Sequence, residues 1–377
     1  MPDAAAVRAA LATVEDPEIR RPITEIDMVK NVAIADDGHV TVGVYLTVAG
    51  CPMRTEITDR VTRAVSAVPG VTRVSVELDV MSEEQRLALR SKLRGGEPDI
   101  PFNKPGSLTR VIAVTSGKGG VGKSSVTVNL AAAMAAKGRK VGLVDADIYG
   151  HSIPRMLGLG TPPTMVEGMI MPPQAHGVTA ISILPFKPGG VSQPVAFRGP
   201  MLHRALLQFL TDVWWGDLDV LLLDLPPGTG DIAMSTAQLL PNAELLVVTT
   251  PQTAAAEVAV RAGMLGKQTQ QRVIGVIENM SSFPCPHCGE PMDLFGVGGG
   301  SLVAERLSEE MQTRVPLLGR VPFDVRLREG GDNGRPLVLD DPSSPAAASL
   351  LGIADGLLAK PRGLVGMSLG VTPASRM

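Results

Sequence analysis

Residues 111–138 read VIAVTSGKGGVGKSSVTVNLAAAMAAKG, and their pattern predicts the class of fold. Gly117 to Ser124 match the pattern G-x-x-x-x-G-K-[ST], between a short apolar run and a stretch of helical composition. A glycine-rich loop in this position binds phosphate, because its backbone N–H groups and the amino terminus of the following helix both attract negative charge. The stretch therefore predicts a strand, a phosphate loop and a helix in a nucleotide-binding α/β domain.

The residue types of this loop suit MgATP. Lys123 can neutralise the β- and γ-phosphates, and the hydroxyl of Ser124 can ligate Mg²⁺. Lys118, at the start of the loop, is not needed for phosphate binding, and from the loop alone it could be a solvated surface lysine. The positions expected to surround the phosphates with their backbone are Gly117, Gly119, Gly120, Val121, Gly122 and Ser125.

Acidic residues follow two other apolar runs. Asp224 ends the run in DVLLLDLPPGTGD (residues 219–231), where a carboxylate can hold Mg²⁺ through water. The run in GLVDADIYGHS (residues 142–152) ends with Asp145 and Asp147. We predict that Asp147 orients the attacking water. Asp145 could have the same role, or it could cap the start of a helix.

The fold class follows from the pattern after Leu108. Apolar runs without polar alternation suit strands that are buried on both faces, and helical stretches between them predict βαβ units. We therefore expect an α/β P-loop NTPase with a mostly parallel sheet flanked by helices, preceded by a small α+β domain. The runs are RVIAVTS, KVGLVDAD, DVLLLDLP, AELLVVTT and RVIGVIEN.

Residues 1–81 predict the small α+β domain. A helix is expected near residues 4–14, two strands around the turn at Gly38, a second helix within 51–70 and a strand over 71–78. Residues 82–107 combine a charged helical stretch with a segment rich in Gly and Pro, and we assign them as a linker. The nucleotide-binding domain then spans 108–360, and the tail 361–377, broken by Gly and Pro, is expected to be disordered.

Composition argues against several classes of function. The 377 residues carry 35 Lys and Arg against 38 Asp and Glu, a net charge of -3 with no basic block, so no nucleic-acid surface is indicated. No apolar run approaches the ~20 residues of a membrane span, and the amino terminus lacks the pattern of a signal peptide. Three cysteines cannot form a disulfide framework, which favours a reducing compartment. We expect a cytoplasmic protein without a membrane or nucleic-acid partner.

Two of the three cysteines lie in SSFPCPHCGE (residues 281–290), as Cys285 and Cys288. A closed tetrahedral metal site needs four ligands, and this pair supplies two. By itself the pair could be a redox couple, half a zinc site or part of an iron–sulfur site. His287 between them is expected to be exposed rather than a ligand. The third thiol, Cys51, is equally compatible with a reactive residue at a helix start and with a small buried residue.

Together these features resemble the deviant Walker A ATPases, a class that includes the nitrogenase iron protein, the arsenite-pump ATPase and the Min and Par ATPases. GKGGVGKS carries this resemblance, with Lys118 as the signature lysine. Over residues 108–360 the chain is most similar to the Mrp/ApbC-type iron–sulfur cluster carriers, through DADIYGHSIPRMLG, DLPPGTGD and NMSSFPCPHCGE. His151 stands where proline is expected. Residues 1–81 resemble a metal–sulfur cluster assembly domain, through DPEI (16–19) and GCPMR (50–54).

The resemblance implies roles for the nucleotide-site residues. It implies slow ATP hydrolysis, with Lys118 reaching across a homodimer interface to the partner's nucleotide. Asp147 is then catalytic, and Asp224 is associated with Mg²⁺. Asn279 in IENMSS and Pro322 in VPFD lie where the family contacts adenine.

The resemblance also implies a cargo. Cys285 and Cys288 from each of two subunits would bridge one [4Fe–4S] cluster, which is then passed to apo-proteins. The expected cofactors are ATP, Mg²⁺ and the [4Fe–4S] cluster. The expected partners are a second copy of the chain, apo iron–sulfur client proteins and cluster scaffold proteins. Cys51 would accept or pass on a cluster.

Two other functions remain alternatives. A Min/Par-like positioning ATPase needs a C-terminal amphipathic helix or a basic patch, and neither is evident in the sequence. A reductase like the nitrogenase iron protein also bridges a cluster between subunits, but that family's cysteines lie far apart in sequence rather than as CxxC.

Overall fold

The computed structural model describes residues 2–47, 53–94, 100–104, 106–147, 150, 152–183, 199–285 and 287–359. The chain divides into two compact units. The first comprises Met1–Asp99, Thr164–Pro172 and Asp212–Gly216, and the second comprises Ile100–Pro163, Pro173–Thr211 and Asp217–Met377. The boundaries 1–81, 82–107 and 108–360 stay predictions, and the tail 361–377 lies outside the described residues.

The first unit contains a three-stranded sheet in the order β1-β2-β3. β1 and β2 are antiparallel across the expected turn at Gly38, and β3 runs parallel to β2. Helix α1 ends at Leu11 rather than at Val14. The elements of this unit are α1 (Ala4–Leu11), β1 (Val29–Ile34), β2 (His39–Leu46), α2 (Arg54–Ser66), β3 (Arg73–Val80), α3 (Glu83–Arg94), and a hairpin of β6 (Thr164–Val166) and β7 (Met169–Met171).

The second unit is built on an eight-stranded sheet in the order β15-β12-β11-β4-β10-β5-β9-β8. Every neighbouring pair is parallel except β8 with β9, which confirms the mostly parallel sheet. The strands are β4 (Arg110–Ser116), β5 (Val141–Asp145), β8 (Gln174–Ala175), β9 (Val178–Ile181), β10 (Val220–Asp224), β11 (Glu244–Thr249), β12 (Val273–Asn279) and β15 (Leu317–Val321).

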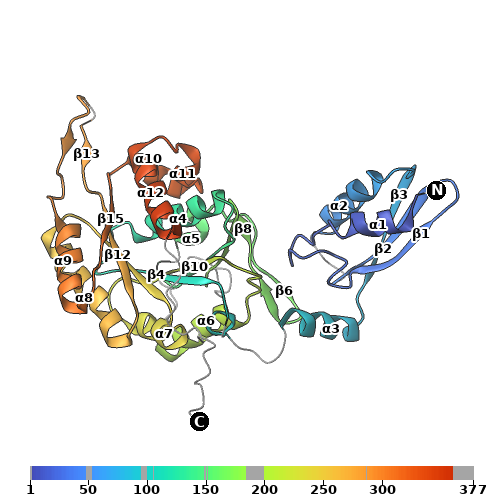
Figure 1. The fold of residues 1–377 in the computed structure, drawn as a ribbon, viewed down its shortest axis with the longest axis horizontal. Coiled ribbons are helices and arrows are strands. Elements are labelled where there is room, and N and C mark those ends of the chain that lie inside the picture. Colours follow the sequence, from blue (N-terminus) through green and yellow to red (C-terminus); the bar gives the residue numbers. More distant parts are fainter. Residues whose placement is uncertain are drawn as a thin grey trace, which may run out of the picture. The chain divides into compact units, whose positions relative to one another are not determined.

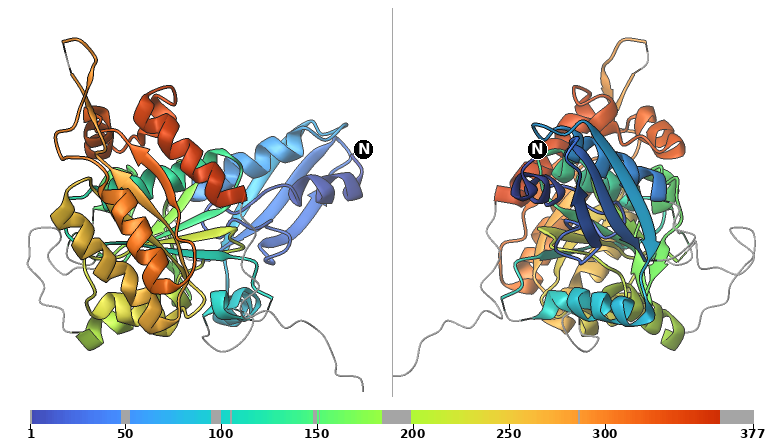
Figure 2. Two further views of the ribbon diagram at one scale, coloured as in Figure 1. Left: turned by 60° about the vertical axis from the view of Figure 1, so that its left-hand side comes forward. Right: turned by 90° about the vertical axis from the view of Figure 1, so that its right-hand side faces the viewer.

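Helices cover both faces of this sheet, with α4, α10, α11 and α12 on one side and α6, α7, α8 and α9 on the other (Figures 1 and 2). Because both faces are covered, every residue of β4, β5, β10, β11 and β12 is buried, as their apolar runs predict. The helices are α4 (Lys123–Ala136), α5 (Ile153–Met156), α6 (Gly199–Thr211), α7 (Asp231–Leu239), α8 (Thr253–Thr269), α9 (Gly299–Met311), α10 (Val325–Asn333), α11 (Leu337–Asp340) and α12 (Pro345–Ala359), with a 3-10 turn η1 (Pro101–Asn103).

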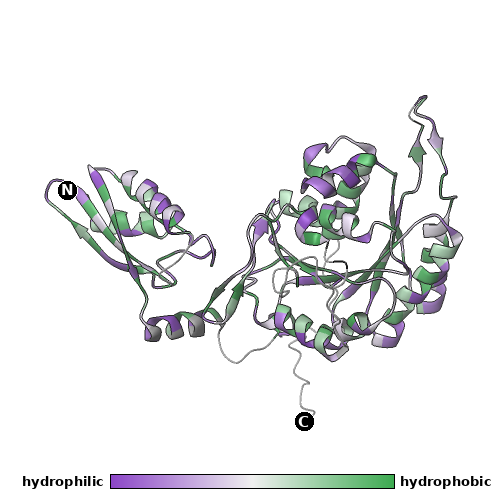
Figure 3. Ribbon diagram, turned by 180° about the vertical axis from the view of Figure 1, so that it is seen from behind, coloured by the Kyte–Doolittle hydropathy of each residue, from purple (hydrophilic) through white to green (hydrophobic). Residues whose placement is uncertain are grey.

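The helices of the second unit are hydrophobic on part of their surface and hydrophilic on the rest (Figure 3). On one face of the sheet, α4, α11 and α12 pack in a core that includes Leu130, Leu222 and Leu350. No helix in the described part of the chain is long and apolar enough to span a bilayer.

A second hairpin, β13 (Phe283–Pro284) and β14 (Pro291–Met292), follows β12 and extends away from the sheet (Figures 1 and 2). Cys285 N donates to Glu290 O at 2.8 Å, and Gly289 N donates to Cys285 O at 2.8 Å. These bonds close the end of the hairpin around the CxxC sequence.

Candidate nucleotide site and thiol hairpin

The phosphate loop joins the carboxyl end of β4 to the amino end of α4. Gly122 precedes the helix with φ of +78°, a conformation that favours glycine. A Cβ atom at Gly122 would lie 2.2 Å from Asn279 Nδ2, so the close approach of β12 also requires glycine there. At Gly117 a Cβ would lie 2.3 Å from the backbone nitrogen of Ala259 in α8. The glycines thus let the loop fold tightly between β12 and α8.

Lys123 and Asp224 meet at the base of the loop. Lys123 Nζ lies 2.7 Å from Asp224 Oδ2, and both side chains are buried, at 6% and 0% exposed. Ser124 Oγ donates to the same carboxylate oxygen at 2.6 Å, and Thr127 Oγ1 donates to Asp224 Oδ1 at 2.8 Å. The side chains of Lys123, Ser124 and Asp224 therefore converge. The hydroxyl and the carboxylate supply oxygen ligands that suit Mg²⁺, and the ammonium group beside them suits a phosphate.

Asp145 places a second buried carboxyl group beside Asp224. It lies opposite Asp224 in the register of β5 and β10, and it is fully buried. Burial, and then the neighbouring carboxylate of Asp224, raise the pKa of Asp145 well above its usual range. Its Oδ2 accepts from Ile153 N at 3.3 Å, while its Oδ1 has no hydrogen-bond partner within the described part of the chain. An orphaned carboxylate oxygen beside a second carboxylate fits a site that takes a divalent cation.

The predicted catalytic residues surround one cavity of about 190 Å³. Lys118, Lys123, Ser124 and Asp147 all line it, together with the backbone of the loop. Asp147 Oδ1 accepts a hydrogen bond from Gly150 N at 2.9 Å, which holds its carboxylate at the cavity wall. The cavity therefore joins the expected phosphate-binding groups and the expected water-orienting acid.

Lys118 has a specific neighbour that the sequence did not indicate. Its ammonium donates to Gln252 Oε1 at 2.8 Å, and both side chains are half-buried. Gln252 follows β11 and occupies the N-cap position of α8, without a side-chain hydrogen bond to the helix. Because β11 lies parallel to β4 and directly beside it, residues that follow the two strands lie close together. The position of Gln252 after an apolar run could therefore have indicated it as a residue of the site. Thr127, which follows Lys123 by one helical turn, was likewise missed.

Asn279 and Pro322, the expected adenine contacts, lie at the ends of neighbouring strands. Asn279 pairs with Val321 in the register of β12 and β15, and Pro322 follows Val321. Asn279 is buried, and its Nδ2 donates to Val121 O of the phosphate loop at 2.9 Å. Val121 has its side chain in the core and so offers the loop only its backbone. Neither Asn279 nor Pro322 lines the 190 Å³ cavity, and the adenine role stays a prediction.

The thiol hairpin presents both cysteines toward solvent. Cys285 is half-buried, while Cys288 and His287 are exposed, as expected for His287. Backbone N–H groups of Cys288 and His287 lower the pKa of the Cys285 thiol, because they stabilise the thiolate. Within the described ranges, no cluster of three or more His, Cys, Asp or Glu residues can hold a metal ion. Cys51 and His151 lie outside the described residues.

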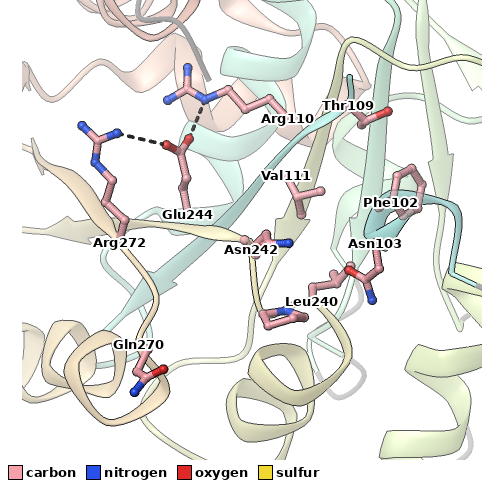
Figure 4. Close-up of a pocket in the computed structure, with 12 residues that line it drawn as sticks. Phe102, Asn103, Thr109, Arg110, Val111, Leu240, Asn242, Glu244, Gln270 and Arg272 are labelled. Carbon is pink, nitrogen blue, oxygen red and sulfur yellow. Dashed lines mark hydrogen bonds and ion pairs between the residues drawn. The ribbon is translucent and has the colours of Figure 1, made fainter. Parts of the chain in front are cut away.

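A separate pocket of about 90 Å³ lies at the amino ends of β4 and β11, at the other end of these strands from the phosphate loop (Figure 4). Arg110 Nε lies 2.5 Å from Glu244 Oε2, and Arg272 reaches the same carboxylate at 3.7 Å. Arg110 also donates to Leu357 O near the end of α12. The charged groups of this pocket pair with one another and with the end of α12. We therefore interpret them as a link between α12 and the sheet rather than as a ligand site.

The chain matches two described protein families. Residues 107–358 match the family described as NUBPL iron-transfer P-loop NTPase. Residues 4–77 match the family described as iron-sulfur cluster assembly protein. The two matches cover the two parts of the chain that the sequence motifs distinguish.

Curated relatives align with nearly the whole chain. The iron-sulfur cluster carrier protein of Mycobacterium tuberculosis is 63% identical over 374 residues, covering 99% of this chain and 97% of the relative. The protein of the same name from Synechocystis sp. is 41% identical over 363 residues, covering 94% of this chain and 97% of the relative.

Among solved structures, a nucleotide-binding protein from Archaeoglobus fulgidus in complex with ADP is 36% identical. It covers 60% of this chain and 87% of its own, with a TM-score of 0.49. The septum site-determining protein MinD from Pyrococcus horikoshii, complexed with Mg-ADP, is 25% identical. It covers 68% of this chain and 100% of its own, with a TM-score of 0.48.

Proposed function

This chain belongs to the family of NUBPL-type iron-transfer P-loop NTPases, and on that premise we propose that it is an ATP-dependent carrier of iron–sulfur clusters. Two subunits bind one [4Fe–4S] cluster as cargo between their thiol hairpins and deliver it to apo-proteins in a reducing cytoplasm. ATP binding and slow hydrolysis switch the dimer between loading and release. The observation that carries this proposal is a pair of accessible thiols on a hairpin that extends from a P-loop NTPase fold.

The nucleotide site supports the ATPase part of the proposal. Lys123 would hold the β- and γ-phosphates, while Ser124 and Asp224 would hold Mg²⁺, whose charge stabilises the phosphoryl group during transfer. Asp147 at the cavity wall would orient the attacking water. Lys118 would stabilise developing charge on the partner's nucleotide.

The number of thiolate ligands supports a [4Fe–4S] cluster as the cargo. A [4Fe–4S] cluster needs four thiolates, and Cys285 and Cys288 give two per chain. A symmetric dimer supplies the other two. The lowered pKa of Cys285 favours the thiolate form that iron requires. A cluster held at an exposed interface can leave when the subunits separate, which suits a carrier rather than a resident redox centre.

The cargo is tested by anaerobic reconstitution with iron and sulfide. Wild type should hold four iron and four sulfide per dimer, with the Mössbauer signature of a [4Fe–4S] cluster, as in other four-thiolate sites. The Cys285→Ala, Cys288→Ala double variant should lose the cluster, while Cys51→Ala should retain it. Transfer is then measured by activation of an apo-enzyme that needs a [4Fe–4S] cluster. A full cluster in the double variant, or only zinc in wild type, contradicts the proposal.

The nucleotide part is tested separately by titration with ATP. Lys123→Ala should abolish measurable binding, because the phosphates lose their main counter-ion. Lys137→Ala, which removes an exposed lysine just beyond the far end of α4, is the matched control and should bind normally. Equal ATP affinity in the two variants would contradict the assignment of this loop as the phosphate-binding site.

A further inference from the structure

We propose that residues 16–21, Asp-Pro-Glu-Ile-Arg-Arg, form a docking motif that holds the amino-terminal part of the chain on hairpin β6–β7 and on Trp214 of the same chain. This motif includes the DPEI sequence, to which the nucleotide and thiol sites assign no role. All of the contacts described below lie within the first unit, which combines Met1–Asp99 with two segments from the middle of the chain.

Asp16 builds the motif as a tight turn. It is 3% exposed, and its Oδ1 accepts from the N–H groups of Glu18 at 2.9 Å and Ile19 at 2.7 Å. Asp16 N donates to Arg21 O, and Arg20 N donates to Asp16 O, at 2.9 and 2.8 Å. Arg20 adopts a φ of +56° within the turn. With its own backbone bonded internally, the turn offers its remaining polar groups to other segments.

Four consecutive residues of the turn contact the middle segments. Thr164 Oγ1 donates to Glu18 Oε1 at 3.2 Å across 146 residues of sequence. Trp214 Nε1 donates to Ile19 O at 2.8 Å across 195 residues. Arg20 Nη2 donates to Pro172 O at 2.6 Å across 152 residues. The Arg21 guanidinium lies 5.6 Å from the centre of the Trp214 ring, within the range of a cation–π interaction.

The hairpin depends on this dock for its apolar contacts. Val166, Met169 and Met171 are 2%, 1% and 3% exposed, and they share one core with Ile19 and other residues of the amino-terminal part. Two strands of three residues each cannot stand alone in water, because a hairpin needs a further layer to bury its side chains. The amino-terminal part supplies that layer.

The geometry favours the same chain rather than a second copy as the occupant. Helix α3, which also belongs to the first unit, pairs with the hairpin through Arg86 Nε and Glu167 Oε1 at 3.0 Å. Every contact described above joins residues of one chain within the first unit, so the dock is complete without a second copy.

The test cuts the covalent connection and asks whether the dock holds. A specific protease site replaces residues 95–98 in the full chain, which is cleaved after folding and passed over a sizing column. The wild-type fragments should stay together. Arg20→Ala, Trp214→Phe and Thr164→Val should each weaken retention by about tenfold, since each leaves a hydrogen-bond partner unpaired. Lys30→Ala, which breaks an exposed pair with Asp79 elsewhere in the first unit, should not.

Fluorescence provides a second readout before cleavage. The chain has two tryptophans, Trp214 and Trp215, so a Trp215→Phe background leaves Trp214 as the reporter. Arg20→Ala should shift its emission to longer wavelength if the dock loosens without unfolding. Cleaved wild-type fragments that separate as readily as the variants overturn the proposal. In the uncleaved protein, a shift of wild-type Trp214 emission to longer wavelength on dilution below the dimer dissociation constant assigns the dock to a second copy and also overturns the proposal. Neither outcome depends on nucleotide or cluster.

Discussion

The ammonium group of Lys118 donates a 2.8 Å hydrogen bond to the side-chain oxygen of Gln252 in the same chain. The family resemblance expects this lysine to reach the nucleotide of a partner subunit. Within one subunit it is instead held at the start of α8, at the edge of its own phosphate cavity. The bond to Gln252 must therefore break before Lys118 can act in trans.

Lys118→Ala should bind ATP with near-normal affinity but hydrolyse it about a hundredfold more slowly, because charge developing in the transition state loses a donor. Steady-state phosphate release and ATP titration measure the two effects. Mixing this variant with Asp147→Ala should restore one working composite site per mixed dimer. Absence of any recovery, under conditions where subunits demonstrably exchange, would argue that Lys118 acts within its own chain.

Gln252→Ala should raise the rate of ATP hydrolysis by up to about tenfold. In this variant Lys118 does not have to break a charge-assisted hydrogen bond of ~1.5–3 kcal/mol before it acts. Gln252→Glu should have the opposite effect, since a carboxylate would hold the ammonium more firmly. Initial rates at a fixed protein concentration give the comparison. If both variants change only thermal stability, Gln252 acts as part of the helix start and does not restrain Lys118.

Gly122→Ala should destabilise the second unit more than Gly138→Ala. Both glycines adopt similar conformations, with φ of +78° and +77°, but only the Cβ at Gly122 would meet an atom, Asn279 Nδ2 at 2.2 Å. The strain from φ is common to both, so the difference isolates the steric clash, which should cost about 1–3 kcal/mol. Urea unfolding curves of the two variants give this difference. Equal losses would show that β12 shifts away from the loop at little cost.

Cys285 should react as a thiolate at lower pH in the folded protein than in the unfolded protein. Its folded-state pKa is lowered by the N–H groups of Cys288 and His287. A thiol whose pKa is lower in the folded state adds to the free energy of unfolding at pH above its unfolded-state pKa. That contribution is lost as the pH falls through its folded-state pKa. The measurement is the rate of iodoacetamide labelling against pH, in a Cys51→Ala, Cys288→Ser variant that retains both N–H groups. Identical midpoints with and without urea would contradict the assignment. The same shift predicts that iron competes with protons at Cys285 down to lower pH than at an ordinary thiol.

The local features of the nucleotide site could be predicted from the sequence. The run from Arg110 to Ser116 became β4 at the bounds expected, because an unbroken apolar run suits a strand covered on both faces. Lys123 begins α4, as the loop pattern requires, and Asp224 ends β10. These features depend on spacing along a short stretch of chain, which the sequence records directly.

The contacts between residues far apart in the sequence could not be predicted and depend on how the chain packs. Gln252 lies 134 residues from Lys118, and Trp214 lies 195 residues from Ile19, yet each pair shares a hydrogen bond. Hydrophobic period and motif spacing carry no information about such pairs, because strand order and the docking of separate segments depend on how whole faces pack together. The hairpin at 164–172 was missed for the same reason: its strands are too short to show a period, and their stability comes from the core of the first unit.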